Sequence, residues 1–173
     1  KTAQDLDQLL GKLFKEIQIY RIDHYLAKEM LQGIMNFRFS NNLLEPSWNA
    51  GAIEKIEISL LEKIGVEQRG AFYDGVGALK DVGQNHLLQM LALITMDHPL
   101  TLDPGAIRDK RAEILRKLVP LTGEAMASNT FRAQYKGYQD IKGVAAHSQT
   151  ETYFRVKAHL DSPRWQGVPS VLE

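Results

Sequence analysis

The chain has 173 residues, of which 44% are hydrophobic, so it suits one domain, or part of a larger one, with a substantial core and little disorder. Its 21 basic residues balance its 21 acidic ones, which leaves no net field for nucleic acid or an anionic membrane and makes any anion site a local one. The absence of cysteine excludes disulfides and thiolate chemistry, and without a signal peptide or an apolar run near the roughly 20 residues that cross a bilayer we expect a soluble protein.

Residues 5–16 have the spacing of an amphipathic helix that packs one apolar stripe on a core. The apolar positions of this stripe are Leu6, Leu9, Leu10, Leu13, Phe14 and Ile17. Residues 17–20 then read as an extended segment.

Residues 21–29, R-I-D-H-Y-L-A-K-E, are unusually dense in ionisable and hydrogen-bonding side chains. From Asp23, which suits an N-cap, the sequence predicts a helix on which His24 and Lys28 share a face. Tyr25 would lie in the first turn, where free N–H groups and the helix dipole favour an anion, so these side chains could bind phosphate oxygens. The alternative is a capped surface helix with solvated charges.

A helix is predicted to continue over residues 29–39, where methionine and other apolar side chains recur at core-facing positions. Asn41-Asn42 and residues 45–49 interrupt the pattern and predict loops. Within the second loop, Trp48 is expected to anchor packing.

Residues 56–60 alternate apolar and polar side chains, which predicts a strand with one buried face. Glu62 comes at its end, where a sheet commonly presents a side chain to a site; the alternative is a solvated carboxylate. Glycines and polar residues over 65–77 then predict an irregular crossing that carries Arg69.

A second long helix is predicted over residues 82–96, apolar almost all round from Leu87 onward and therefore buried on most sides. Asp81 and His86 lie at its polar N-terminal end with two amide side chains. Five residues turn an α-helix by about 140° relative to the first, so Asp81 and His86 should not pair. We therefore expect His86 to take its carboxylate partner from elsewhere in the chain.

Asp103-Pro104 predicts another helix start, and Pro120 predicts its end. The basic residues of this helix are expected to form a solvated face, since acidic residues are interspersed with them. They are Arg108, Lys110, Arg111, Arg116 and Lys117.

The last third predicts loops over residues 122–128 and 137–150 and strands over 131–136, over 153–160 and after Pro169. Helices come first and alternating strands later. This order predicts an α+β fold with helices packed on one face of a mostly antiparallel sheet.

Four strings together resemble the glucose-6-phosphate dehydrogenase family. They are R-I-D-H-Y-L-A-K-E at 21–29, R-G-A-F-Y-D at 69–74, K-D-V-G-Q-N-H-L-L-Q at 80–89 and R-W-Q-G-V-P at 164–169. Their order and spacing are similar to that family along nearly the whole chain, least so over 106–149. Ala27 stands where the family usually has glycine.

The resemblance implies that residues 1–173 are the substrate-binding and catalytic C-terminal domain of a larger two-domain enzyme, truncated at both ends. It implies oxidation of the C1 hydroxyl of glucose 6-phosphate to 6-phosphogluconolactone, the first step of the oxidative pentose phosphate pathway. The hydride acceptor would be NADP, or NAD in some members, bound mainly by the absent nucleotide-binding half. A cytoplasmic homo-dimer or homo-tetramer is implied as well.

The resemblance also implies residue roles. His86 would be the general base that takes the hydroxyl proton, and Asp23 would orient it. The 6-phosphate would be held by His24, Tyr25 and Lys28, and the sugar hydroxyls by Glu62 and Asp81. Arg164 and Trp165 are assigned to structure or to nucleotide-side contacts.

No residue is assigned to the cofactor, because Gly75-x-Gly77 lacks the third glycine and the βαβ setting of a dinucleotide fingerprint. The chain alone is therefore expected to be inactive. A second hypothesis is a non-catalytic sugar-phosphate-binding or oligomerisation module derived from the family. A metal site or a glycosidase pair among the carboxylates is weaker, since no metal-ligand spacing is present and neither explains the nearby His24 and Lys28.

Overall fold

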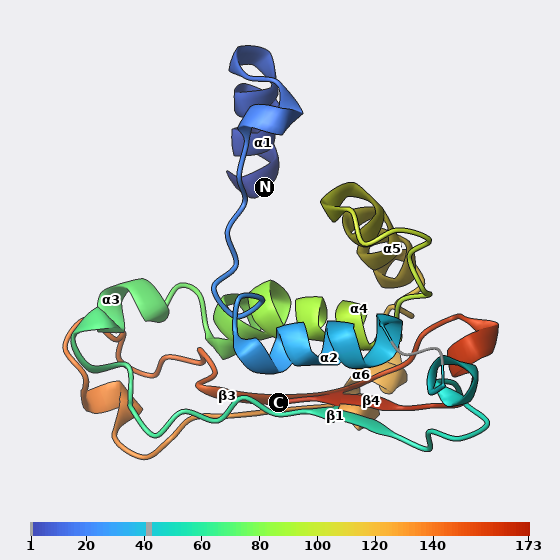
Figure 1. Ribbon diagram of the computed structural model, residues 1–173. Coiled ribbons are helices and arrows are strands. Elements are labelled where there is room, and N and C mark those ends of the chain that lie inside the picture. The colour runs from blue at the N-terminus through green and yellow to red at the C-terminus, as the bar shows by residue number, and fades with distance from the viewer. Residues whose placement is uncertain (1, 41–42) are drawn as a thin grey trace.

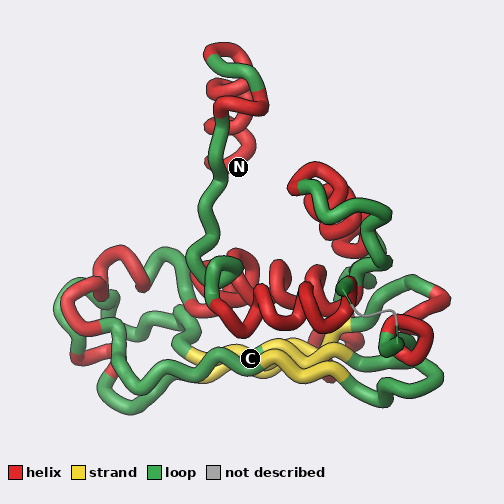
Figure 2. The backbone as a smooth tube through the Cα atoms, in the orientation of Figure 1, coloured by secondary structure: helices red, strands yellow, loops and turns green. Residues whose placement is uncertain are grey.

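The computed structural model describes residues 2–40 and 43–173, so the loop predicted at Asn41-Asn42 lies outside the described residues. In the described part, one four-stranded sheet has the order β1-β4-β3-β2, with β1 parallel to β4 and the other pairs antiparallel. The strands are β1 (Ile56–Ile58), β2 (Thr130–Ala133), β3 (Tyr153–Ala158) and β4 (Ser170–Leu172). The helices α2 (Glu29–Phe39) and α4 (Leu88–Thr95) lie along one face of this sheet, which confirms the predicted α+β class (Figures 1 and 2).

Alternation predicted β1 and β3 well, because each buries one face, whereas the apolar face predicted for β2 is wrong, since Phe131 is exposed. Ile56 and Ile58 are buried on either side of an exposed Glu57, and β3 buries Phe154 and Ala158. The observed strands are shorter than predicted and lie inside or at the edge of the predicted ranges.

The N-terminal helix α1 (Thr2–Leu13) stands away from the sheet and its covering helices (Figure 1). The helix was predicted, but the apolar stripe that was expected to pack on a core is exposed, including Leu6, Leu9 and Phe14. The extended segment expected after it begins only at Ile19, because residues Glu16–Gln18 form a single 3-10 turn, η1.

The helix α5 (Pro104–Arg116) begins as predicted, with Asp103 at the N-cap and proline in the first turn, and ends short of Pro120. The loop predicted over residues 122–128 is wrong, because α6 (Gly123–Asn129) occupies it. Extended Thr122 provides the N-cap, Gly123 takes a positive φ of 53° at the first position, and helix-forming side chains follow. The remaining short helical segments are η2 (Glu45–Ser47), η3 (Glu67–Arg69), α3 (Gly70–Tyr73), η5 (Tyr138–Asp140) and η6 (Pro163–Trp165).

The second long helix is present but begins earlier and is wound in two ways. Its first part, η4 (Leu79–Leu87), is a π-helix and runs directly into α4. The N–H of Leu88 donates to the carbonyl of Gly83, five residues back. The predicted burial is confirmed, since Leu87 and Leu91 are fully buried at the centre of the core.

None of the helices in the described residues is both long and apolar enough to cross a bilayer. The core lies between the sheet and the η4–α4 rod, with α2 beside that rod. Trp48 packs against this core, as predicted. Arg164 contacts Trp48, Glu45 and Asp97, so its interactions in the described residues are structural.

Candidate active site

The residues after the N-terminal helix form a tight turn rather than the predicted helix. The carboxylate of Asp23 accepts a hydrogen bond from the N–H of Tyr25 at 2.9 Å, and its carbonyl accepts from the N–H of Leu26 at 3.1 Å. A short aspartate side chain that binds the backbone two residues on competes with helix formation. Lys28 is extended, with φ −65° and ψ 137°, and serves as the N-cap of α2. The prediction that a helix starts at Asp23 is therefore wrong, and Lys28 adjoins the helix start.

His86 and Asp23 come together although they lie 63 residues apart in the chain. Nδ1 of His86 is 3.0 Å from Oδ1 of Asp23. The two side chains are 17% and 19% exposed, so the pair is shielded but reachable. An ionised carboxylate can only accept, and the ring N–H at Nδ1 therefore donates to Asp23.

Two further rings, those of His24 and Tyr25, lie against this pair. The ring centroids of Tyr25 and His86 are 4.2 Å apart, and those of His24 and His86 are 5.2 Å apart. Nζ of Lys28 lies 3.9 Å from the Tyr25 ring centroid. The exposed His24 and Lys28 thus stand beside a buried Tyr25, next to His86.

Two further carboxylates approach the same place from other elements. The hydroxyl of Tyr25 donates weakly to Glu62 at 3.5 Å. Burial, and then the charge of Glu62, raise the pKa of Tyr25, with a smaller contribution from Asp81 on η4. Glu62 and Asp81 also line a cavity of about 320 Å³, next to which the His86–Asp23 pair lies without lining it. The structure therefore brings together all seven residues singled out from the sequence.

The π-winding of η4 changes the geometric expectation for Asp81 and His86. In a π-helix hydrogen bonds join residues five apart, so the two residues lie one turn apart on the same face. The α-helical angle of about 140° does not apply to them. Among the described residues, Asp81 and His86 form no hydrogen bond or ion pair with each other, since Nδ1 of His86 is turned to Asp23.

Asp23, His24 and His86 also present donor atoms within 4.8 Å of one another, a set that could hold a metal ion. Their spacing in the sequence gave no metal motif, because the ligands come from two distant segments. Oδ1 of Asp23 is already shared by the N–H of Tyr25 and the ring of His86, and the ammonium of Lys28 stands close by. This arrangement favours proton handling beside an anion over cation binding.

Two residues near the site were missed. Arg111 of α5 was expected to be solvated, but it is partly buried and donates to the amide oxygen of Gln89, one turn beyond His86. Burial lowers the pKa of Arg111, and the charge of Asp23 opposes that shift. Glu151 caps η4 from the strand side. Neither position carries a local signal, since a single charged residue in a helix or before a strand is commonly solvated.

Two family descriptions match the chain. Residues 35–173 match "Glucose-6-phosphate dehydrogenase, C-terminal domain", and residues 1–33 match "Glucose-6-phosphate dehydrogenase, NAD binding domain". The turn with Asp23 lies in the second of these matches and His86 in the first. The site thus joins side chains from both matched stretches.

Curated relatives and solved structures agree with these matches. The glucose-6-phosphate 1-dehydrogenase of Aggregatibacter actinomycetemcomitans is 45% identical over 179 residues, covering 98% of this chain and 36% of that protein. The same enzyme of Rhizobium meliloti (strain 1021) is 41% identical over 182 residues, covering 99% of this chain and 37% of its own length.

The crystal structure of glucose-6-phosphate 1-dehydrogenase from Mycobacterium avium is similar with a TM-score of 0.88 at 42% identity, covering 98% of this chain and 37% of that one. A glucose-6-phosphate dehydrogenase in complex with its substrate glucose-6-phosphate gives a TM-score of 0.89 at 35% identity, covering 98% and 36%. The chain thus spans 36% to 37% of these relatives. Because the C-terminal domain description matches residues 35–173, the chain belongs to the glucose-6-phosphate dehydrogenase family.

Proposed function

We propose that this chain supplies the sugar site and the general base of a glucose-6-phosphate 1-dehydrogenase, which oxidises the C1 hydroxyl of glucose 6-phosphate to 6-phosphogluconolactone. The observation that carries the proposal is the contact of 3.0 Å between His86 and Asp23, beside His24 and Lys28. It combines a proton acceptor with hydrogen-bond donors suited to the oxygens of a phosphate. Homo-oligomeric state and cytoplasmic location stay predictions.

His86 takes the proton from the C1 hydroxyl in this proposal. Its Nδ1–H is held by Asp23, which leaves Nε2 with a free lone pair for the substrate. The carboxylate fixes this tautomer and stabilises the imidazolium that forms. Imidazole suits the task because it changes charge near neutral pH.

The substrate's other groups meet complementary partners. Lys28, at the start of α2, and His24 can donate to phosphate oxygens, and both are exposed. Glu62 and Asp81 accept hydrogen bonds from sugar hydroxyls, which are donors. The neighbouring cavity of about 320 Å³ keeps both carboxylates open to a ligand.

No described segment of this chain carries the glycine-rich turn between a strand and a helix that cradles a dinucleotide. The residues named here therefore act on the sugar and its proton. A bound nicotinamide cofactor, proposed to be NADP and alternatively NAD, supplies the hydride acceptor.

The proposal is tested with His86→Ala in the full-length protein, assayed with glucose 6-phosphate and NADP. We expect kcat to fall by about 10²-fold or more, the range for a general base. His159→Ala is the matched control, because His159 lies outside the site, and it should keep the wild-type rate. Near-normal turnover by His86→Ala would remove His86 from this role.

The phosphate assignment is tested with Lys28→Ala. The variant should lose affinity for glucose 6-phosphate far more than for unphosphorylated glucose, since only the former offers the anion. Equal losses for both sugars would place Lys28 elsewhere. Binding of glucose 6-phosphate by the wild type without cofactor-dependent turnover would support the non-catalytic module instead.

A further inference from the structure

The π-helix η4 carries two of the proposed site residues and sets their relative direction. Asp81 lies in its first turn and His86 near its end. The charge of Asp81 acts on Tyr25, whose ring lies 4.2 Å from that of His86. An α-helix would turn Asp81 and His86 about 140° apart, whereas the π-winding brings both toward one side of the helix.

A π-helix of nine residues is an uncommon winding and needs support from its surroundings. Glu151 provides it at the N-terminal end, where helical N–H groups lack partners within the helix. The N–H of Leu79 donates to Oε1 of Glu151 at 3.0 Å, and the N–H of Ala78 donates to its carbonyl at 3.0 Å. Gly77 turns the chain into the helix with φ +78°, and a Cβ on it would collide with the Glu151 carboxylate.

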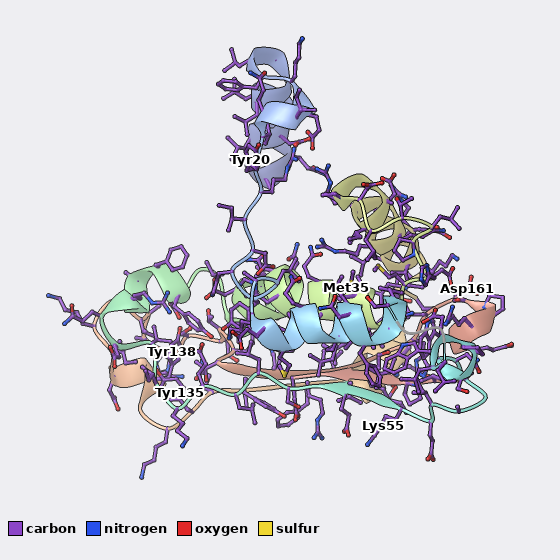
Figure 3. All side chains as sticks on the ribbon, in the orientation of Figure 1. Tyr20, Met35, Lys55, Tyr135, Tyr138 and Asp161 are labelled. Atoms are coloured by element: carbon purple, nitrogen blue, oxygen red, sulfur yellow. The ribbon has the colours of Figure 1, made fainter. Side chains whose placement is uncertain are left out.

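Hydrogen bonds hold the backbone on both sides of Glu151. It stands two residues before β3, and the N–H of the intervening Thr152 donates to the β2 carbonyl of Ala133 at 2.9 Å. On its other side the loop is tied to Asp74, which accepts hydrogen bonds from Tyr138 and Ser148. Tyr138 lies beside Tyr135 below α3 (Figure 3), with ring centroids 5.7 Å apart.

The helix also rests directly on the strand that follows Glu151. A Cβ at Gly83 would lie 2.7 Å from Cζ of Phe154, so only glycine permits this approach. Glu151 from the end and Phe154 from below therefore fix η4 relative to the sheet. The position of both site residues depends on the same short segment, residues 151–154.

We propose that Glu151 is a positioning residue, which acts through η4 to aim Asp81 and His86 at the substrate. The inference rests on the proposed function of those two residues. In this proposal Glu151 contacts neither the sugar nor its proton. It controls the orientation of Asp81 and His86, which do.

The test compares Glu151→Ala with Glu151→Gln in the full-length protein. The alanine variant leaves the N–H of Leu79 without its acceptor, and we expect kcat/KM for glucose 6-phosphate to fall by about tenfold to a hundredfold, as for a small misplacement of reacting groups. The glutamine variant keeps an acceptor oxygen in place and should stay within about threefold of the wild type. Glu124→Ala, an exposed glutamate in the first turn of α6, is the control and should change nothing.

Rates are divided by the concentration of folded sites, because a merely stabilising residue would change the folded amount but leave kcat and KM per site unaltered. A positioning residue changes both, since Asp81 binds the sugar and His86 accepts the proton. Equal kcat and KM per folded site in Glu151→Ala and the wild type would overturn the inference.

A second readout does not depend on turnover. Amide exchange at Leu79 and the ring NMR signals of His86 should change in Glu151→Ala and stay near wild type in Glu151→Gln. If the wild type turns over no glucose 6-phosphate, the proposed function fails, and these signals still decide the role of Glu151. Unchanged signals in Glu151→Ala would overturn the inference by themselves.

Discussion

The free backbone groups at the two ends of the η4–α4 rod are satisfied by different kinds of partner. At the N-terminal end, a carboxylate and a carbonyl of Glu151 accept from the first free N–H groups, and the site residues around it are partly exposed. At the C-terminal end, one buried guanidinium, one buried indole and one partly buried indole donate to the last carbonyls. They are Arg38 on Leu93, Ile94 and Met96, Trp48 on Ile94, and Trp165 on Thr95.

This difference in hydrogen-bond partners indicates that the C-terminal end of the rod serves stability and that the N-terminal part carries the candidate site. Arg38 is fully buried, and Glu45 provides its counter-charge at 3.2 Å. Burial lowers the pKa of Arg38 to about 10, with Glu45 opposing that shift. Glu45 also binds Arg164 at 2.6 Å, so the C-terminal end is a closed network with little to offer a ligand. The N-terminal half of the rod leaves its charged groups within reach of solvent and of the proposed substrate.

Removing Arg38 should give the largest loss of stability. Arg38→Met keeps the volume but removes the donor to the carbonyls of Leu93 and Met96, while the carbonyl of Ile94 keeps the indole of Trp48, so the free energy of unfolding should fall by about 3–5 kcal/mol. Urea unfolding measures the loss. Lys55→Met, which breaks an exposed pair with Glu57, is the control and should cost less than about 1 kcal/mol.

The folded fraction of Arg38→Met should keep near-normal kcat per site, since the carbonyls that Arg38 binds begin at Leu93, about two helical turns beyond His86. A large loss of kcat at unchanged folded concentration would show that the two ends are coupled.

Asp23→Asn should have the reverse profile. The amide side chain still offers an oxygen to the N–H of Tyr25, but it stabilises the imidazolium of His86 poorly and permits the wrong tautomer. We expect kcat to fall by about 10²-fold or more, close to 3 kcal/mol of transition-state stabilisation, with little change in urea midpoint. A destabilisation as large as that of Arg38→Met would contradict the division between the two ends.

The sequence predicted the elements whose patterns are local. The strand β3 follows from alternation, and α5 follows from Asp103-Pro104, because burial of one face and the chemistry of an N-cap are written into neighbouring residues. The wrong predictions also have local causes. The turn after Asp23 replaces a helix because a side chain binds the backbone, and α6 was hidden by its initial glycine.

The site was predictable only in part, and for a different reason. Short strings that resemble a known family pointed to Asp23 and His86, and the structure places them in contact. The winding of η4 and the cap by Glu151 depend on packing against β3, which no local pattern records. Arg111 was misjudged because interspersed acidic residues made its helix look solvated.

Trp165→Phe tests the C-terminal end with a single lost hydrogen bond. The indole Nε1–H donates to the carbonyl of Thr95 at 2.7 Å, and Trp165 is 1% exposed, so water cannot replace it. The free energy of unfolding should fall by about 1–3 kcal/mol, the cost of an unsatisfied buried carbonyl together with some lost packing. Thermal or urea unfolding measures it. A change below the experimental error would mean that the donors from Arg38 and Trp48 are sufficient to stabilise this end of the rod.

The smallest effect is expected from Asp74→Asn, and it should depend on pH. Hydrogen bonds from Ser148, from the N–H of Ala145 and from Tyr138 hold the pKa of Asp74 below its usual value. Since the folded pKa is lower than the unfolded one, ionised Asp74 stabilises the protein at pH above about 4. That contribution is lost as pH falls through the folded pKa.

The difference in unfolding free energy between wild type and Asp74→Asn should therefore be present at neutral pH and shrink in acid, when both side chains are uncharged. The difference between wild type and Trp165→Phe should stay constant over the same range, because neither indole nor carbonyl ionises. Urea unfolding of both variants from pH 7 down to pH 3 therefore distinguishes a charged contribution in the loop before Glu151 from a neutral hydrogen bond at the C-terminal end of the rod. A pH-independent difference for Asp74→Asn would mean that the loop before Glu151 is held by neutral hydrogen bonds rather than by the charge of Asp74.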